Sequence, residues 1–354
     1  MSDTIRVIGN TGFGSGYKQA AKNIFECFEN SKLNCIFQDK QGKVSSVKGS
    51  VINPDKSFHI TAPPFGRLYS SYNIAYFYWE TDTLPVSWRR EIHLMNEIWS
   101  PCNLVTNCLK KIGYKGLIRH VPTPSQDKKN IKNLINFKIE NDMVLDDSCF
   151  KFYSIFQWNY RKGYDILIKS YLEEFSENEN VILILKTNPL YNKNTNFTIN
   201  IKKFISGIKS KIKKKNFPKI IISTEFFSNL EIDALHESGD CFVLPHRGEG
   251  WGMPIARAIQ YDNHVITTKF GGVTDYLNDS NANIIKHNMA FVQNMSWTGL
   301  YKSSQKWAEP CPDSLKENMR QVFSQKDYSK ILNRLNVKRL ISKENFINAI
   351  NDYL

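Results

Sequence analysis

The stretch CFVLPHRGEGWGMPIARAIQYDNHVIT, residues 241–267, decides the fold. Its apolar run at 241–244 predicts a buried strand, and a second apolar run at 265–267 predicts another. Between them, a glycine-rich turn leads into a helical pattern at 254–261, which opens with Pro254, a residue suited to the first helical turn. A strand, a helix and a second strand in this order form the unit from which parallel α/β sheets are built.

The same alternation of apolar runs and helical patterns continues on both sides of this unit. A polar stretch rich in Lys and Asn, at 122–148, divides the chain into two α/β halves. Because open parallel sheets bind ligands beyond the carboxyl ends of their strands, two such domains facing each other predict a cleft that holds the chemistry. Further strands are expected at 5–9, 33–37, 74–78, 98–99, 117–121, 150–156, 181–186 and 220–223, and helices at 17–28, 103–112, 163–175, 199–212, 229–237 and beyond 313.

Charge and cysteine content narrow the classes of function. The chain has 354 residues, with 47 Lys and Arg against 34 Asp and Glu, so its formal net charge of +13 favours anionic partners. Its 7 cysteines form no CxxC pair, which indicates neither a disulfide framework nor a zinc site. No run approaches the roughly eighteen apolar residues of a membrane-spanning helix, and no signal peptide is recognised. We expect a cytoplasmic protein that does not bind nucleic acid, since no nucleic-acid motif is present.

The loop between the strand and the helix has the composition of a phosphate site. Its glycines let the backbone approach a ligand closely, and the free amides at the start of the helix form an anion site. A purely structural turn is the alternative. The residues that we assign to the site are His246, Arg247, Gly248, Glu249, Gly250 and Gly252.

Two segments resemble the donor-binding core of glycosyltransferase family 4: EGWGMP at 249–254 and VITTKFGGVTDYL at 265–277. Members of that family are retaining enzymes of the GT-B type, with two Rossmann-like domains. The resemblance covers most of the chain from about residue 73 to residue 320 and is weaker before it. Further segments that agree are WETDTLP at 79–85, EIWSP at 97–101, SIFQWNYRKG at 154–163 and WAEP at 307–310.

The resemblance implies an architecture and an activity. Residues 1–125 would form the acceptor-side domain and residues 126–325 the nucleotide-sugar domain, with helices at 326–354 packing back on the first. The enzyme would move a hexose-type sugar from a UDP- or GDP-sugar to a glycan, a lipid-linked or a protein acceptor with retention of configuration. It would need no catalytic metal and no cofactor beyond its substrate.

The resemblance also implies roles for charged residues. Arg161 and Lys162 would neutralise the diphosphate, whose negative charge grows as the glycosidic bond breaks. Glu249 would hold hydroxyls of the donor hexose. Glu80 follows a predicted strand and would orient the acceptor hydroxyl, with a surface or capping role as the alternative. The catalytic set is Glu249, Lys162 and Glu80, and Trp251, Gly271 and Gly272 complete the donor site.

One position departs from the family pattern. The family carries two glutamates eight positions apart, the second of which tends to bind the nucleotide ribose, but Arg257 stands eight positions after Glu249. A guanidinium cannot accept a hydrogen bond from a ribose hydroxyl. Arg257 is expected to contact a phosphate, to pair with Glu249 or to favour an unusual donor. A non-catalytic protein that only binds a nucleotide or a glycan is the alternative function.

Two further segments each allow two interpretations. The loop NTGFGSGY at 10–17 almost spells a dinucleotide fingerprint, and we place Gly14, Ser15 and Gly16 near the donor diphosphate or the acceptor, with a simple tight turn as the alternative. The segment 201–219 carries eight lysines and no acid. We favour a solvated helix face over a patch that attracts anionic lipids, which would make the protein peripheral at a membrane.

Overall fold

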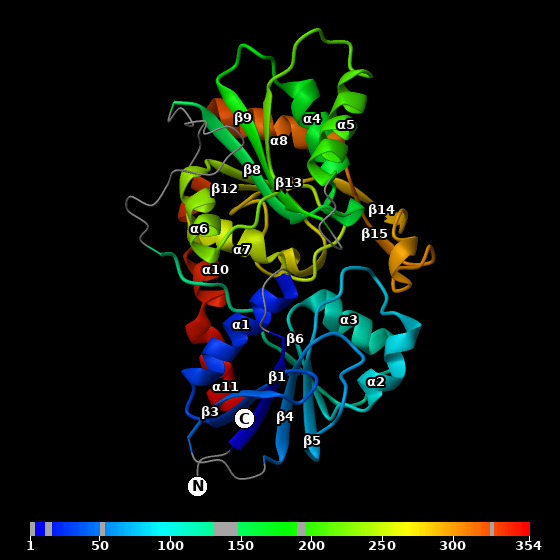
Figure 1. Ribbon diagram of the computed structural model, residues 1–354, viewed down its shortest axis with the longest axis vertical. Helices are drawn as coiled ribbons and strands as arrows, with labels where there is room; N and C mark the ends of the chain where they lie inside the picture. Colours follow the sequence, from blue (N-terminus) through cyan, green and yellow to red (C-terminus); the bar gives the residue numbers. More distant parts are fainter. Residues whose placement is uncertain (1–3, 11–15, 50–53, 130–147, 190–195, 326–328) are drawn as a thin grey trace.

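The structure consists of two lobes, each built around one β-sheet (Figure 1). It is a computed structural model that describes residues 4–10, 16–49, 54–129, 148–189, 196–325 and 329–354. Within these ranges, the first sheet has seven strands, the second has six, and a separate two-stranded hairpin follows the second. The α/β architecture of two facing Rossmann-like domains is therefore confirmed, while the domain boundaries stay a prediction.

The first sheet has the strand order β3-β2-β1-β4-β5-β6-β7, and its neighbouring strands run parallel except β2 and β3. Helix α1 (Gly16–Glu29) follows β1 and turns Ile24 and Phe28 into the core. The other elements of this lobe are β1 (Thr4–Gly9), β2 (Asn34–Gln38), β3 (Val44–Lys48), β4 (Lys56–Ile60), β5 (Tyr72–Tyr76), η1 (Val86–Trp88), α2 (Arg89–His93), β6 (Glu97–Ser100), α3 (Asn103–Lys111) and β7 (Leu117–His120).

The second sheet is parallel throughout and has the order β10-β9-β8-β11-β12-β13. Counted from β8, this is the doubly wound order 3-2-1-4-5-6. Its strands are apolar runs such as VILIL, buried on both faces, as expected for a parallel sheet covered by helices. Its elements are β8 (Phe150–Gln157), η2 (Tyr160–Lys162), α4 (Tyr164–Glu174), β9 (Val181–Asn188), α5 (Phe197–Lys209), β10 (Lys219–Ser223), α6 (Asn229–Ser238), β11 (Cys241–Leu244), α7 (Met253–Gln260), β12 (His264–Thr268), η3 (Gly271–Asp275) and β13 (Asn283–Ile285).

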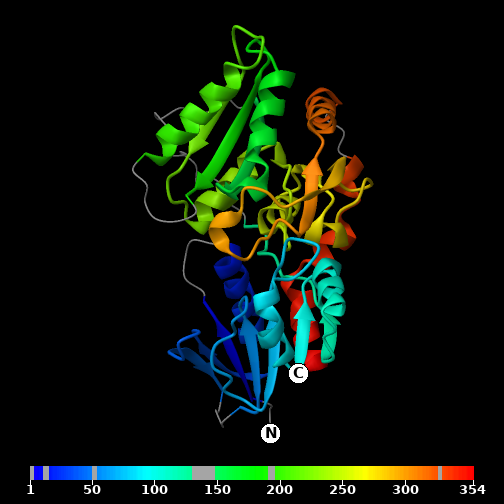
Figure 2. The same cartoon turned by 90° about the vertical axis from the view of Figure 1, so that its right-hand side faces the viewer.

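The last helices return to the first lobe. Helix α8 (Pro312–Gln325) packs on α4, whereas α11 (Lys343–Tyr353) packs on α1 (Figure 1). Phe346 of α11 is buried against the rings of Tyr76 and Trp99, at centroid distances of 5.8 and 5.9 Å. The C-terminal helices thus cross back to the first lobe, and Figure 2 shows both chain ends there. The remaining elements are β14 (His287–Phe291), η4 (Ser296–Thr298), β15 (Lys306–Pro310), α9 (Ser329–Leu332) and α10 (Leu335–Leu340).

Five strands lie where the sequence predicted none: β3, β4, β13, β14 and β15. Strand β3 is mostly exposed at the edge of the first sheet, so it shows no apolar pattern. Strand β4 has the polar sequence KSFHI, yet four of its five residues are buried, and Nε2 of His59 lies 3.1 Å from Oδ1 of Asn73. The hairpin of β14 and β15 was also missed, because exposed residues alternate irregularly along β14.

The lysine-rich segment forms helix α5 and the turn that follows it. Ile205 is buried on the sheet side, while Lys202 and Lys203 are exposed. Nζ of Lys214 donates to the carbonyl of Leu172 at 3.1 Å and so closes the end of α4. This arrangement fits a solvated helix face, and membrane contact stays a prediction.

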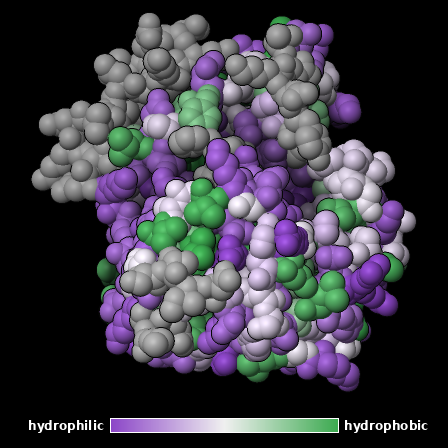
Figure 3. Space-filling model, turned by 60° about the horizontal axis from the view of Figure 1, so that its bottom comes forward, coloured by the Kyte–Doolittle hydropathy of each residue, from purple (hydrophilic) through white to green (hydrophobic). Residues whose placement is uncertain are grey.

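None of the helices in the described ranges has the length and apolarity to cross a membrane. On the face drawn in Figure 3, apolar residues lie in separate patches between hydrophilic ones.

Candidate active site

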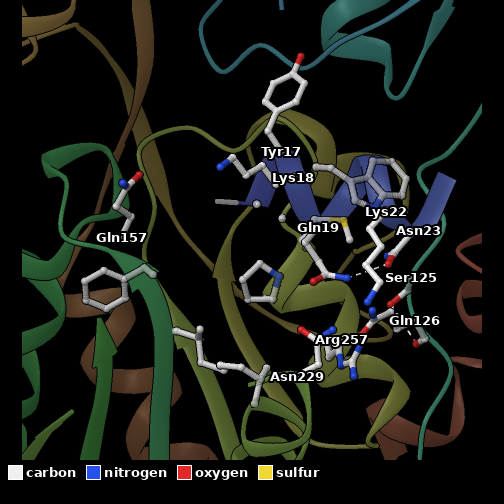
Figure 4. Close-up of a pocket in the computed structure, with 18 of the residues that line it drawn as sticks. Tyr17, Lys18, Gln19, Lys22, Asn23, Ser125, Gln126, Gln157, Asn229 and Arg257 are labelled. Atoms are coloured by element: carbon white, nitrogen blue, oxygen red, sulfur yellow. Dashed lines mark hydrogen bonds between the residues drawn. The ribbon is translucent and has the colours of Figure 1, made fainter. Parts of the chain in front are cut away.

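A cavity of about 1120 Å³ lies between the two lobes. Its wall comes from α1 of the first lobe, and in the second lobe from the ends of β8 and β9 and from segments that follow β8, β10 and β11 (Figure 4). Strands β8 and β11 are neighbours although β9 and β10 separate them in the sequence, so the strand order reverses between them. Doubly wound sheets bind ligands in the crevice at such a reversal.

The centre of the wall is an ion cluster of Arg161, Lys162 and Glu249. The ammonium of Lys162 contacts Oε1 of Glu249, and Nη1 of Arg161 lies 3.7 Å from the same oxygen. The two cations follow β8 and the carboxylate follows β11. Gly163 lets these loops meet, because its φ is 70° and a Cβ there would lie 1.8 Å from the carbonyl oxygen of Pro245.

Burial and mutual attraction set the charges of this cluster. Burial raises the pKa of Glu249, but Lys162 and Arg161 outweigh it and lower that pKa to about 2. Burial lowers the pKa of Lys162; Glu249 opposes this effect and the positive charge of Arg161 adds to it. Among the residues that the structure describes, the ammonium of Lys162 donates only to Glu249, so two of its three donors remain for another acceptor such as a phosphate.

Glu80 enters the cavity from the first lobe. Its Oε2 accepts a hydrogen bond from the Tyr301 hydroxyl at 2.7 Å, and its Oε1 lies 3.4 Å from Nη2 of Arg161. Tyr301 in turn stacks on Trp79 at a centroid distance of 5.0 Å. Glu80 therefore joins the first lobe to the ion cluster of the second, and its role toward an acceptor stays a prediction.

Helix α7 begins at the same cavity. Gly252 is its N-cap residue, with φ of 82°, and Pro254 stands in the first turn. Gly250, Trp251 and Gly252 all line the cavity. The start of the helix, with its free backbone amides and positive dipole end, thus borders the space beside Lys162.

Arg257 does not pair with Glu249. Its Nη2 contacts Oδ1 of Asp233 on α6, and its Nη1 contacts Oε1 of Gln126 in the segment that joins the lobes. Asp233 is fully buried, while Arg257 lines the cavity, where Lys22 of α1 extends toward it (Figure 4). The expected pairing with Glu249 is wrong, because Asp233 takes that place. Contact with a phosphate or with an unusual donor stays a prediction.

The structure does not bring Arg247 to the cavity. Its guanidinium is 1 % exposed, donates to Asp165 at 2.8 and 2.9 Å and to Glu309 at 2.8 Å, and stacks on the ring of Tyr160. Arg247 holds the loop between β11 and α7 (residues 245–252, hereafter the donor loop) against α4 and β15 instead of reaching a ligand. The predicted site residues that do line the cavity are Gly16, Glu80, Arg161, Lys162, Glu249, Gly250, Trp251, Gly252 and Arg257.

Four more predicted residues lie behind the cavity wall. His246 is fully buried, and burial lowers its pKa to about 3, so its ring is neutral. Gly248 packs on Glu80, whose carbonyl oxygen would lie 2.2 Å from a Cβ. Gly271 and Gly272 pack in the same way on the backbone of the donor loop. These residues shape the loop. Gly14 and Ser15 lie outside the described residues.

Part of the cavity wall was not predicted from the sequence. Lys186 near the end of β9 lines the cavity, as do Tyr17, Lys22 and Asn23 of α1. The signal for Lys186 was a charged residue closing an otherwise apolar strand, VILILK. The α1 residues gave no signal of their own, because they belong to an ordinary amphipathic helix pattern.

A family model described as Glycosyl transferases group 1 matches residues 139–322. The chain belongs to this family. The matched part contains the ion cluster of Arg161, Lys162 and Glu249 and the start of α7. No curated protein matches the chain in sequence.

Solved structures of low sequence identity show the same GT-B fold. An Escherichia coli structure described as trehalose-6-phosphate bound with UDP-2-fluoro glucose has a TM-score of 0.68 at 8% identity, over 99% of this chain and 98% of that chain. A glycosyltransferase from Rickettsia africae ESF-5 has a TM-score of 0.68 at 13% identity, over 99% and 97%. Anabaena Alr3699/HepE in complex with UDP-glucose has a TM-score of 0.62 at 11% identity, over 99% and 97%.

Proposed function

We propose that this group 1 glycosyltransferase moves a hexose-type sugar from a nucleotide sugar, a UDP- or GDP-sugar, to a glycan, a lipid-linked or a protein acceptor with retention of configuration. The observation that supports the proposal most is the meeting of Arg161, Lys162 and Glu249 where the strand order reverses. UDP-glucose and a fluoro analogue occupy two of the similar structures, which supports a nucleotide sugar as the donor.

The cluster suits a departing diphosphate. As the bond between the anomeric carbon and the phosphate oxygen breaks, negative charge grows on the phosphate. Arg161, Lys162 and the start of α7 are fixed before the reaction and gain attraction as that charge develops. Glu249 holds Lys162 in place and has a second oxygen for a hydroxyl of the donor sugar. These groups therefore stabilise the transition state more than the ground state.

Retention requires attack on the face from which the diphosphate leaves. The acceptor oxygen forms its bond to the anomeric carbon, the bond to the phosphate oxygen breaks, and the acceptor proton passes to an oxygen of the leaving phosphate. Glu80 lies on the first lobe opposite the donor loop and can orient the acceptor hydroxyl by accepting a hydrogen bond.

Two size-conserving variants test the proposal. We expect Lys162→Met and Glu249→Gln each to lower nucleotide release from UDP- or GDP-sugars by about 10²-fold or more. Lys162→Met removes a cation from the diphosphate site, and Glu249→Gln removes the carboxylate that holds Lys162 and accepts a hydroxyl of the donor sugar. Lys169→Met removes an exposed lysine of α4 and is the matched control. Circular dichroism and thermal unfolding check that each variant folds. Wild-type turnover in both folded variants would contradict the site assignment.

A second candidate function is binding without transfer. Its support is Arg257, which stands where the resemblance places a ribose-binding glutamate and is fixed by Asp233. This candidate predicts that a nucleotide sugar binds the wild-type protein without release of nucleotide in the presence of any acceptor. Nucleotide release that Lys162→Met abolishes would exclude it.

A further inference from the structure

Lys186 is a buried cation that the proposed mechanism does not use. It lies in the cavity wall and is 6 % exposed. Its ammonium lies 4.8 Å from the centroid of the Phe227 ring, and the carbonyl oxygen of Thr187 is 3.5 Å away. An ammonium has three donors, so two find no acceptor among the residues that the structure describes. A buried donor without an acceptor costs free energy, which a ligand in the cavity would recover.

Nearby carboxylates do not supply the missing acceptor. Burial lowers the pKa of Lys186 to about 8, and the charges of Glu225 and Glu231 oppose this effect. In the described part of the chain, neither carboxylate forms an ion pair with Lys186. Oε2 of Glu231 instead accepts the backbone N–H of Ser228 at 2.7 Å and caps α6. At neutral pH, Lys186 is therefore mostly charged, and its remaining donors border the cavity.

The place of Lys186 in the sheet fits one part of a nucleotide. Lys162 follows β8, Lys186 lies near the end of β9 and Phe227 follows β10, and these three strands are neighbours. From β8 to β10, two strand spacings are about 10 Å, roughly the reach from a diphosphate across a ribose to its base. A diphosphate held at Lys162 thus allows the base to extend past Lys186 on the middle strand toward Phe227 and the exposed Phe226, which supply aromatic surface.

We propose that Lys186 reads the base of the donor nucleotide: it donates to the exocyclic oxygen of an oxo base and disfavours an amino base. The inference rests on the proposed function. Uracil and thymine present O4 and guanine presents O6 as acceptors, whereas cytosine and adenine present amino donors. When the ammonium faces an amino group, both groups are hydrogen-bond donors and neither finds an acceptor. A buried site that donates a hydrogen bond to its ligand therefore strongly disfavours a base that lacks the acceptor oxygen.

UDP and CDP form the sharpest test pair, because their bases differ at the exocyclic group on C4 and in the proton on N3. We expect the full-length wild-type protein to bind UDP, or GDP if the donor is a guanosine nucleotide, at least about tenfold more tightly than CDP or ADP in isothermal titration. Lys186→Met keeps the length of the side chain. In this variant the dissociation constants of the two nucleotides of the pair should differ by no more than about threefold. Lys169→Met is the control and should keep the wild-type preference.

The outcomes separate this inference from the proposed function. If no nucleoside diphosphate binds the wild type, the donor assignment fails and the inference fails with it. If nucleotides bind but Lys186→Met keeps the wild-type preference, only the role of Lys186 is wrong. A loss of inorganic pyrophosphate binding in Lys186→Met would also overturn the inference, because it would make Lys186 a phosphate ligand. Thermal unfolding of Lys186→Met confirms that the variant is folded.

Discussion

Two arginines of the donor half owe their orientation to carboxylates that are distant in the sequence. Arg247 binds Asp165 and Glu309, 82 and 62 positions away, and Arg257 binds Asp233, 24 positions away. In each case the guanidinium is almost fully buried, so its charge requires a partner. Arg247 thus holds elements of the second lobe together, whereas Arg257 forms part of the cavity wall.

Removing the Arg247 guanidinium should destabilise the second lobe. Arg247→Met leaves Asp165 and Glu309 without their cation, and we expect a loss of about 3 kcal/mol in the free energy of unfolding. The matched control is Arg320→Met, since Arg320 also pairs with two carboxylates but is partly exposed and should cost about 1 kcal/mol or less. Urea denaturation measures both, and equal losses would contradict the structural role of Arg247.

Arg257 and Asp233 should behave as one unit. Arg257→Glu places a second carboxylate beside the buried Asp233, and the repulsion should cost about 2 kcal/mol or more. Arg257→Glu combined with Asp233→Asn removes the repulsion and should regain most of that stability. A double-mutant cycle measured by denaturant unfolding gives the coupling energy. Additive effects of the two substitutions would show that the contact is not formed.

The donor loop is the element that connects the two lobes at the site. A Cβ at Gly248 would meet the carbonyl oxygen of Glu80, and a Cβ at Gly250 would lie 2.6 Å from Cβ of Tyr78. The loop between β11 and α7 is therefore glycine-rich partly because the first lobe lies against it. The βαβ pattern around 241–267 predicted the strand, the loop and the helix, but a contact with residues 78 and 80 leaves no mark in such a pattern.

Gly248→Ala should disturb the approach of the lobes more than the stability of either one. We expect nucleotide release to fall about tenfold or more, because the added methyl moves Glu80 away from Arg161 and the donor loop. Gly207→Ala in α5 is the control: its Cβ meets nothing within 4 Å, and the change should stabilise the protein by about 0.5–1 kcal/mol. Unchanged release by Gly248→Ala would indicate that the lobes need not approach this closely during turnover.

At the scale of the whole molecule, the chain crosses between the lobes twice, at 121–129 and again before α11. The second crossing places Phe346 in the core of the first lobe, beside Tyr76 and Trp99. Two further contacts tie α11 there, from Lys343 to Glu26 at 2.8 Å and from Nζ of Lys56 to the carbonyl of Leu354 at 2.8 Å. The first lobe therefore depends on the end of the chain for its stability.

Phe346→Ala should weaken the first lobe. The buried ring leaves a cavity, and we expect a loss of about 3–5 kcal/mol in the free energy of unfolding. Ile347→Ala, one position further along α11, removes a partly buried side chain and should cost less. Thermal unfolding followed by tryptophan fluorescence measures both variants, and a smaller loss for Phe346→Ala than for Ile347→Ala would contradict the packing of α11.

Features that depend on residues close together in the sequence could be predicted, whereas contacts between residues far apart in the sequence could not. Apolar runs such as those of β8, β9 and β11 predicted the sheets, because burial on both faces requires unbroken apolar residues. The polar strand β4 was missed, since its sequence shows no apolar pattern and His59 meets its partner Asn73 only in the folded chain. The family resemblance identified Lys162 and Glu249. They follow β8 and β11, and they meet because these two strands are neighbours in the sheet. The burial of Arg247 between Asp165 and Glu309, and the Lys186 donors that no described residue accepts, could be found only in the folded chain, because the surrounding residues come from other elements.

The binding of a nucleotide sugar beside Lys162 is tested most directly by thermal unfolding of the wild type and Lys162→Met with a panel of UDP- and GDP-sugars. A ligand that binds the folded state raises the melting temperature by mass action. We expect at least one donor to raise the wild-type melting temperature by a few degrees and to leave that of Lys162→Met nearly unchanged. An equal shift in both proteins, or no shift with any donor, would contradict the assignment of the donor site.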